Sequence, residues 1–149
     1  MKRIRVFAIA ILALLTFGVS VSAEVLNRPA YWEFDVAQNL PVLVIKSEKM
    51  PNIAAHIKQA QANGKASTLT RITDKAQIDA NREAACGRFV RQGNLECDEY
   101  PFASTREGGS GASTRGVPPR EQRVQGGTMS SFYRYQNIRN GSQFIVRVN

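Results

Sequence analysis

The densest group of polar side chains in the chain is the acidic run from Glu96 to Pro101, which reads Glu-Cys-Asp-Glu-Tyr-Pro. Three carboxylates within four residues repel one another unless a cation or an arginine compensates their charge. If the run forms a strand, Asp98 and Glu99 point to opposite faces, so one could face a site while the other supports the structure. Pro101 would end that strand. On spacing alone, an acidic turn beside a disulfide is the alternative.

A second polar group lies at Arg120-Glu121-Gln122-Arg123. Glu121 and Gln122 offer oxygen ligands for a hard metal ion, and Arg120 and Arg123 could hold phosphate. The same pattern is typical of the solvated start of a helix. This stretch alone does not decide between the two interpretations.

The N-terminal segment predicts export. Basic residues at positions 2, 3 and 5 precede an apolar run over residues 6–19, and Val21-Ser22-Ala23 is a small-residue cleavage signal. This is the pattern of a secretory signal peptide, which leaves residues 24–149 as the mature domain. An N-terminal membrane anchor is the alternative, but the run is shorter than the roughly 20 apolar residues that a span needs.

Two cysteines and one histidine limit the chemistry further. In an oxidising compartment, a disulfide between Cys86 and Cys97 is the default expectation, and it would be worth on the order of 3 kcal/mol. A nucleophilic cysteine is the competing interpretation, but His56 lies thirty residues before Cys86. Zinc sites of four cysteines, or of two cysteines and two histidines, are excluded for a single chain.

The basic excess of this 149-residue chain lies in its second half. The net charge is +8, and it falls to +5 without residues 1–23, which hold three basic and no acidic side chains. Residues 81–149 contain ten arginines, no lysine and six acidic residues. Arginine binds phosphate oxygens in pairs, which indicates an anionic partner. A solvated surface that happens to use arginine is the alternative.

Hydrophobic periodicity predicts one small α+β domain. The length suits one domain, two at most, and the apolar content of 43% is enough for a core. Helices are predicted from Pro51 to Gly64, from an Asp74 cap to about Ala85, and over residues 121–134. Strands are predicted over residues 41–45 and 67–72 and, after an Asn-Gly turn at 140–141, through residue 148, while residues 103–119 are predicted to be a loop.

A family resemblance adds to this interpretation. The run Cys97–Thr105, CDEYPFAST, with Glu107-Gly108-Gly109 after it, resembles the signature of the NucA/NucB family of secreted deoxyribonucleases. The resemblance covers about residues 42–148. Weaker parts of it are the segment 42–57, Asn81-Arg82, Val117-Pro118, Gln125-Gly126-Gly127, Phe132-Tyr133 and the segment 141–148.

This resemblance implies a ββα-metal nuclease-like core, in which a hairpin and a helix hold one divalent cation, Mg²⁺ or Mn²⁺. It implies a metal-dependent endonuclease that hydrolyses phosphodiester bonds of DNA without sequence preference. Asp98 would be the general base, so His56 is expected to be a structural residue far from the acidic run. Gln122, where family members usually have Asn, would ligate the cation, with Glu121 as a second candidate.

The remaining expectations complete the site. Glu99 would support Asp98, and Glu107 and Gln125 would support the site around them. Phosphate-binding candidates are Arg82, Arg106, Arg120 and Arg123. We expect a monomer that is secreted or periplasmic, does not contact a membrane after signal removal, and binds DNA, with RNA left open. The alternative is a non-catalytic secreted protein that binds DNA or another polyanion through a degenerate metal site.

Overall fold

The structure is a computed structural model, and it describes residues 32–149. The predicted signal peptide, residues 1–23, lies outside the described residues. Within residues 32–149, no helix has the length and apolar character needed to cross a membrane.

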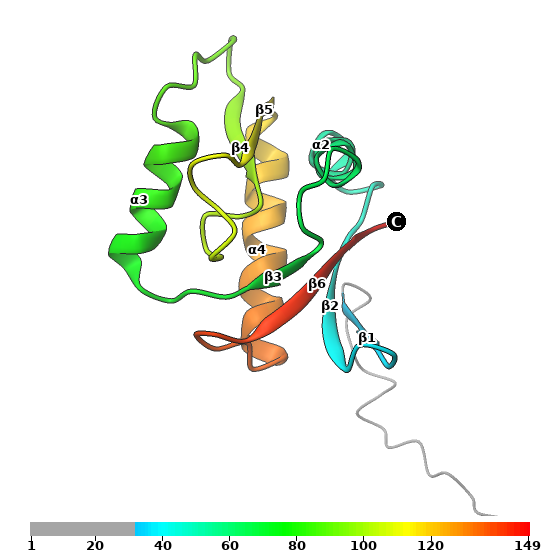
Figure 1. Ribbon diagram of the computed structural model, residues 1–149. Helices are drawn as coiled ribbons and strands as arrows, with labels where there is room; N and C mark the ends of the chain where they lie inside the picture. The colour runs from blue at the N-terminus through cyan, green and yellow to red at the C-terminus, as the bar shows by residue number, and fades with distance from the viewer. Residues whose placement is uncertain (1–31) are drawn as a thin grey trace, which may run out of the picture.

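Two sheets and three helices make up the described part of the chain (Figure 1). The larger sheet has the strand order β1-β2-β6-β3, with β2 and β6 parallel and the other two pairs antiparallel. Its strands are β1 (Trp32–Asp35), β2 (Leu40–Ile45), β3 (Thr68–Thr70) and β6 (Gln143–Val148). The smaller sheet is the antiparallel pair β4 (Glu96–Tyr100) and β5 (Ser113–Val117). The helices are α2 (Pro51–Ala62), α3 (Lys75–Cys86) and α4 (Pro119–Tyr135).

The predicted helix signals lie where the helices begin and end. Pro51 is in the first turn of α2, where its missing N–H costs nothing. The Asp74 side chain accepts a hydrogen bond from the Gln77 backbone N–H and so caps α3. Helix α4 runs through Gly126 and Gly127 without interruption. The helix propensity lost at those glycines is therefore outweighed by the packing of α4, whose Phe132 is fully buried.

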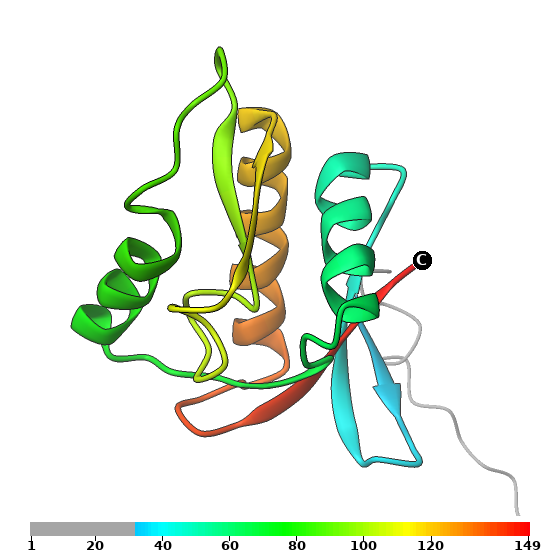
Figure 2. The same ribbon diagram turned by 45° about the horizontal axis from the view of Figure 1, so that its top comes forward.

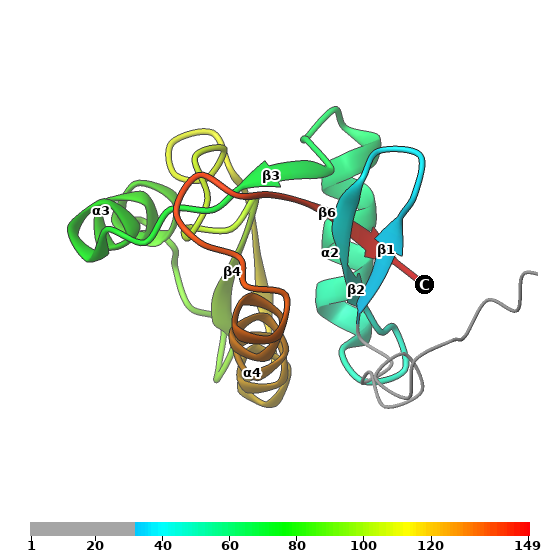
Figure 3. The same cartoon turned by 90° about the horizontal axis from the view of Figure 1, so that it is seen from below.

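The β4–β5 pair lies at the centre of the helices, with α2 on one side and α3 on the other (Figures 2 and 3). The main core fills the space between α2, α4 and the larger sheet, and its largest buried side chains include Leu43, Tyr100, Phe132 and Phe144. Helix α3 buries none of its residues. It therefore lies at the periphery of the fold and is attached to the rest of it by a few specific contacts.

The structure confirms an α+β fold, and β4–β5 followed by α4 gives the order that a ββα core requires. One prediction of local structure was wrong. Residues 113–117 of the predicted loop form β5. Pairing with β4 stabilises this strand, whereas its Ser-, Thr- and Gly-rich sequence has only a weak strand preference. Residues 32–35 of the unassigned N-terminal segment form β1, an edge strand paired with β2.

Candidate active site

The acidic run is strand β4, and its two central carboxylates lie on opposite sides of the strand, as strand alternation predicts. Glu99 faces a cavity of about 690 Å³, whose walls come from α3, β4, α4 and the segments beside them. Asp98 faces α2 and does not line this cavity. The two neighbours in sequence therefore have different environments and different chemical uses.

The carboxylate of Glu99 lines the cavity and has a perturbed acidity. Its side chain is 13% exposed, and the Arg82 Nε lies 3.8 Å from its Oε1. Burial raises the pKa of Glu99 from 4.5 to about 6, the Arg82 charge opposes this rise, and the Asp98 charge adds to it. A carboxylate with this pKa is ionised at neutral pH yet is a stronger base than an ordinary glutamate.

Asp98 belongs to a buried polar network. Its Oδ2 lies 2.6 Å from the His56 Nδ1, and the His56 Nε2 lies 2.9 Å from the Ser113 Oγ. Asp98 and His56 are each 1% exposed. The expectation that His56 lies far from the acidic run was wrong, because α2 packs against the β4–β5 pair. The network joins α2 to both strands of that pair.

Two polar side chains in the first turns of α4 face different parts of the fold, one toward α2 and the other toward the cavity. Glu121 is buried against the start of α2, where its carboxylate accepts hydrogen bonds from the backbone N–H groups of Asn52 and Ile53 and from the Asn52 amide. It satisfies N–H groups that a helix start leaves unpaired. Gln122 faces the cavity, and its Nε2 donates to the Cys97 carbonyl oxygen at 2.9 Å. Only Gln122 of the two predicted metal ligands therefore lines the cavity.

The structure also brings Gln125 to the cavity, one helical turn after Gln122. Gln125 is 6% exposed, and its Nε2 has no hydrogen-bond partner within residues 32–149. A buried amide donor without a partner costs free energy unless something pairs with it. Gln125 thus lines the cavity and carries a buried amide donor that has no partner within residues 32–149.

The predicted phosphate-binding arginines are separated in space. Arg82 lines the cavity, whereas Arg120 and Arg123 are exposed on the first turns of α4 and do not. Arg106 lies beside β3, where its backbone N–H donates to the Thr70 carbonyl oxygen.

Sequence reasoning missed two arginines of the cavity, Arg71 and Arg91. Arg71 stands before the arginine-rich half, so the charge count directed attention away from it. Its guanidinium lies over the Tyr133 ring, 4.2 Å from the ring centroid, and donates to the Ser104 carbonyl oxygen. No sequence spacing links Arg71 to Tyr133, since β3 and α4 meet only in the folded chain.

Helix α3 is held against the site by covalent and polar links. The predicted disulfide between Cys86 and Cys97 is present and joins the end of α3 to β4. The Asn81 amide donates to the carbonyl oxygens of Ala103 and Thr105, in the loop after β4. In that loop the carboxylate of Glu107 accepts from the Thr70 backbone N–H. These links fix the loop and the cavity wall relative to Glu99.

The donor set of the cavity fits a divalent cation of the magnesium type. Within residues 32–149, no three His, Cys, Asp or Glu side chains gather as a metal cluster. The cavity nevertheless presents the carboxylates of Glu96 and Glu99 and the amides of Gln122 and Gln125. Mg²⁺ is commonly bound through one or two carboxylates while it keeps several waters, so side chains of these types are chemically suited to it.

Comparisons with known proteins give the family context. Residues 53–147 match the Deoxyribonuclease NucA/NucB family. The DNA-entry nuclease of Bacillus subtilis (strain 168) is 30% identical over 94 residues, which is 63% of this chain and 59% of that protein. The chain therefore spans less than two thirds of the length of this relative. The family match, residues 53–147, includes every element that lines the cavity from α3 to α4.

Proposed function

The chain belongs to the NucA/NucB deoxyribonuclease family, and we propose that it is an exported endonuclease that hydrolyses phosphodiester bonds of DNA in the cavity beside Glu99. One observation carries the proposal. The cavity combines a carboxylate whose pKa is raised to about 6 with the cationic side chains of Arg71, Arg82 and Arg91. A proton acceptor next to phosphate-binding cations is the arrangement that phosphodiester hydrolysis needs.

Glu99 is the proton acceptor in this mechanism. Its carboxylate takes a proton from a water molecule, whose oxygen attacks the phosphorus in line with the departing oxygen. The bond from phosphorus to that oxygen then breaks, and the departing oxygen takes up a proton from solvent. A base in hydrogen-bond reach typically contributes roughly 10²–10⁴-fold in rate. We assign this role to Glu99 in place of Asp98, since Asp98 is 1% exposed and bonded to His56.

The arginines of the cavity bind and orient the phosphate. Arg82 lies beside Glu99, and Arg71 is held in place by Tyr133 and Ser104. The Arg82 guanidinium donates paired hydrogen bonds to phosphate oxygens, and the positive charges of Arg71 and Arg82 stabilise the charge that develops on those oxygens. The exposed Arg120 and Arg123 on α4 bind flanking phosphates, so binding is sensitive to salt and indifferent to sequence.

A divalent cation, Mg²⁺ or Mn²⁺, completes the site. Gln122 and Glu96 would hold it, because both line the cavity, and because the Gln122 amide nitrogen is bonded to the Cys97 carbonyl oxygen, its amide oxygen is the atom that would bind the cation. When bound, the cation neutralises charge on a phosphate oxygen. Glu121 has no part in this set, since its carboxylate is used by the start of α2.

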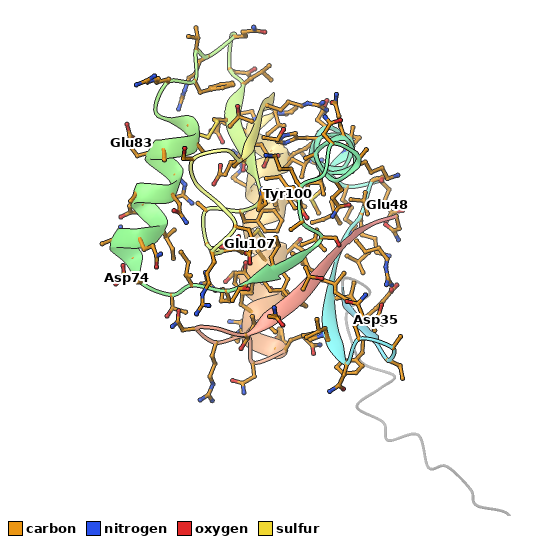
Figure 4. All side chains as sticks on the ribbon, viewed as in Figure 1. Asp35, Glu48, Asp74, Glu83, Tyr100 and Glu107 are labelled. Atoms are coloured by element: carbon orange, nitrogen blue, oxygen red, sulfur yellow. A yellow bond between two sulfur atoms is a disulfide. The ribbon has the colours of Figure 1, made fainter. Side chains whose placement is uncertain are left out.

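Plasmid digestion by the purified oxidised protein tests the proposal. We expect cleavage with Mg²⁺ or Mn²⁺ that stops in EDTA, and a loss of at least 10²-fold in Glu99→Gln. Glu83→Gln is the matched control, because Glu83 is exposed on the outer side of α3 (Figure 4). Retained cleavage in Glu99→Gln, or cleavage lost only in a folded Asp98→Asn variant, would return the base role to Asp98. Binding to DNA without cleavage under either cation would favour the non-catalytic alternative.

A further inference from the structure

The cavity beside Glu99 has an apolar side that phosphate binding does not explain. Its lining includes Phe89, Phe102, Met129 and Tyr133 together with the arginines. A phosphate is polar on every side and gains nothing from aromatic walls, whereas a nucleobase has two apolar faces and a polar edge. We propose that the cavity holds the base of one unpaired nucleotide adjacent to the scissile phosphate, an inference that rests on the proposed function.

The size of the cavity suits this occupant. Its volume of about 690 Å³ falls in the range of about 300–1,000 Å³ that is usual for pockets that enclose a small organic molecule. A site for the sugar–phosphate backbone alone could be a shallow basic surface. A hollow of this size, at the carboxylate that accepts the proton, has room for a nucleotide with its base turned inward.

Arg71 supplies a stacking surface. One face of its guanidinium lies on the Tyr133 ring, and its Nη1 donates to the Ser104 carbonyl oxygen. The Tyr133 hydroxyl is fixed in turn by the Ser104 Oγ at 3.0 Å. The guanidinium is thus held in a fixed orientation in the lining of the cavity. Proteins that bind unpaired nucleotides stack bases on aromatic rings and on arginine planes.

Gln125 supplies an independent polar observation. It lines the same cavity, it is more than nine-tenths buried, and its Nε2 is without a partner in the described part of the chain. A base carries carbonyl oxygens and ring nitrogens on its edge, and these accept hydrogen bonds from an amide. A base whose edge reached this amide would therefore pair a donor that has no partner within residues 32–149.

An inward-turned base implies a substrate class. In a duplex the bases are stacked and paired, so an enzyme that encloses a base must extrude it or act on single strands. Extruding a base from a duplex costs free energy and therefore slows the cleavage of paired DNA, whereas a single strand has no pairing to break. We therefore expect single-stranded DNA, or an unpaired position in a duplex, to be cut faster than fully paired DNA of the same sequence.

Abasic scanning tests this inference on the unmodified protein. End-labelled single-stranded oligonucleotides carry one abasic residue at a chosen position and are digested with Mg²⁺ or Mn²⁺ to a small extent. We expect one cleavage product, from the bond at a fixed offset from the abasic residue, to fall on the order of tenfold, since one stacked base contributes about that much to binding. The same oligonucleotide in a full duplex should be cut more slowly.

Two variants locate the effect. Phe89→Ala and Gln125→Leu should each lower cleavage of the intact strand and reduce the penalty of the abasic residue. Phe34→Ala, which alters a 47% exposed ring on β1, should leave both unchanged. Uniform cleavage past the abasic residue, with paired and unpaired DNA cut alike, would overturn the base pocket and leave the nuclease assignment intact. Absence of cleavage at every bond would instead refute the proposed function.

Discussion

Replacing Arg82 should move the pH dependence of cleavage, because Arg82 opposes the rise in the pKa of Glu99. With that pKa at about 6, roughly a tenth of the molecules have an ionised Glu99 at pH 5 and roughly nine tenths at pH 7. Activity that needs the ionised base should therefore rise about ninefold across this range. In Arg82→Gln, Glu99 loses a nearby positive charge, and the rise should shift to higher pH.

The size of this shift follows from the geometry. The two charges lie 3.8 Å apart, and the Arg82 side chain is 60% exposed, so water screens the pair. Coulomb's law at the dielectric constant of water gives about 1 kcal/mol at this distance, which agrees with the upper range for exposed ion pairs. This free energy corresponds to a shift of the acid limb by somewhat less than about 1 pH unit, since 1.36 kcal/mol equals one unit of pKa.

The assay is kcat/KM for a quenched fluorescent oligonucleotide between pH 4.5 and 8 at constant ionic strength. The absolute rate of Arg82→Gln should also fall, because Arg82 binds phosphate in our mechanism, but the position of the limb reports Glu99 alone. Arg88→Gln is the matched control, because it removes the same charge from an exposed residue outside the cavity. A limb near the ordinary glutamate pKa in the wild type, or an unmoved limb in Arg82→Gln, would refute the reasoning.

Three further predictions concern stability and are measured by urea unfolding. Glu99→Gln should raise the free energy of unfolding by about 2 kcal/mol at pH 7 and leave it unchanged at pH 4. The reason is that the pKa of Glu99 rises from 4.5 to about 6 on folding, so the wild-type protein loses stability as the pH rises through that window. An equal gain at both pH values would contradict this prediction. His56→Ala should lose about 3–5 kcal/mol by leaving Asp98 buried without its partner, while His56→Leu with Asp98→Leu should recover most of that loss. Replacing Cys86 and Cys97 by alanine should cost about 3 kcal/mol, and an unchanged unfolding midpoint would show that α3 is held by its polar contacts alone.

Local signals in the sequence were sufficient for the helices and for most strands. The Asp74 cap, Pro51 in a first turn and the apolar spacing of Ile53 and Ile57 each act within a few residues, so they can be recognised without the fold. Strand β5 could not be predicted in this way. Its residues have weak strand preference, and its stability comes from pairing with β4, thirteen or more residues away in the chain. Prediction failed where a partner distant in sequence decides the structure.

The site follows the same rule. From the sequence we could identify the acidic run, the disulfide and Gln122. The pairing of Arg71 with Tyr133 and the burial of Glu121 against α2 could not be predicted. Residues that act through a tertiary neighbour carry no local spacing that identifies them. The arginine count of residues 81–149 pointed to the right half of the chain for Arg82 and Arg91 and to the wrong half for Arg71.

Our proposal that Glu99 is the base in place of Asp98 could not have been made from the sequence alone. Strand alternation requires that one carboxylate faces the cavity, but it does not say which. The packing of helix α2 decides the orientation, because α2 lies against one side of β4–β5 and brings His56 to Asp98. Glu99 therefore lies on the opposite side of β4. The buried pair thus fixes the orientation of the strand and adds a negative charge that raises the pKa of Glu99. Asp98 can therefore influence the proposed base without touching the substrate, and an acid limb of the pH profile that moves to lower pH in Asp98→Asn would distinguish this role from that of the base itself.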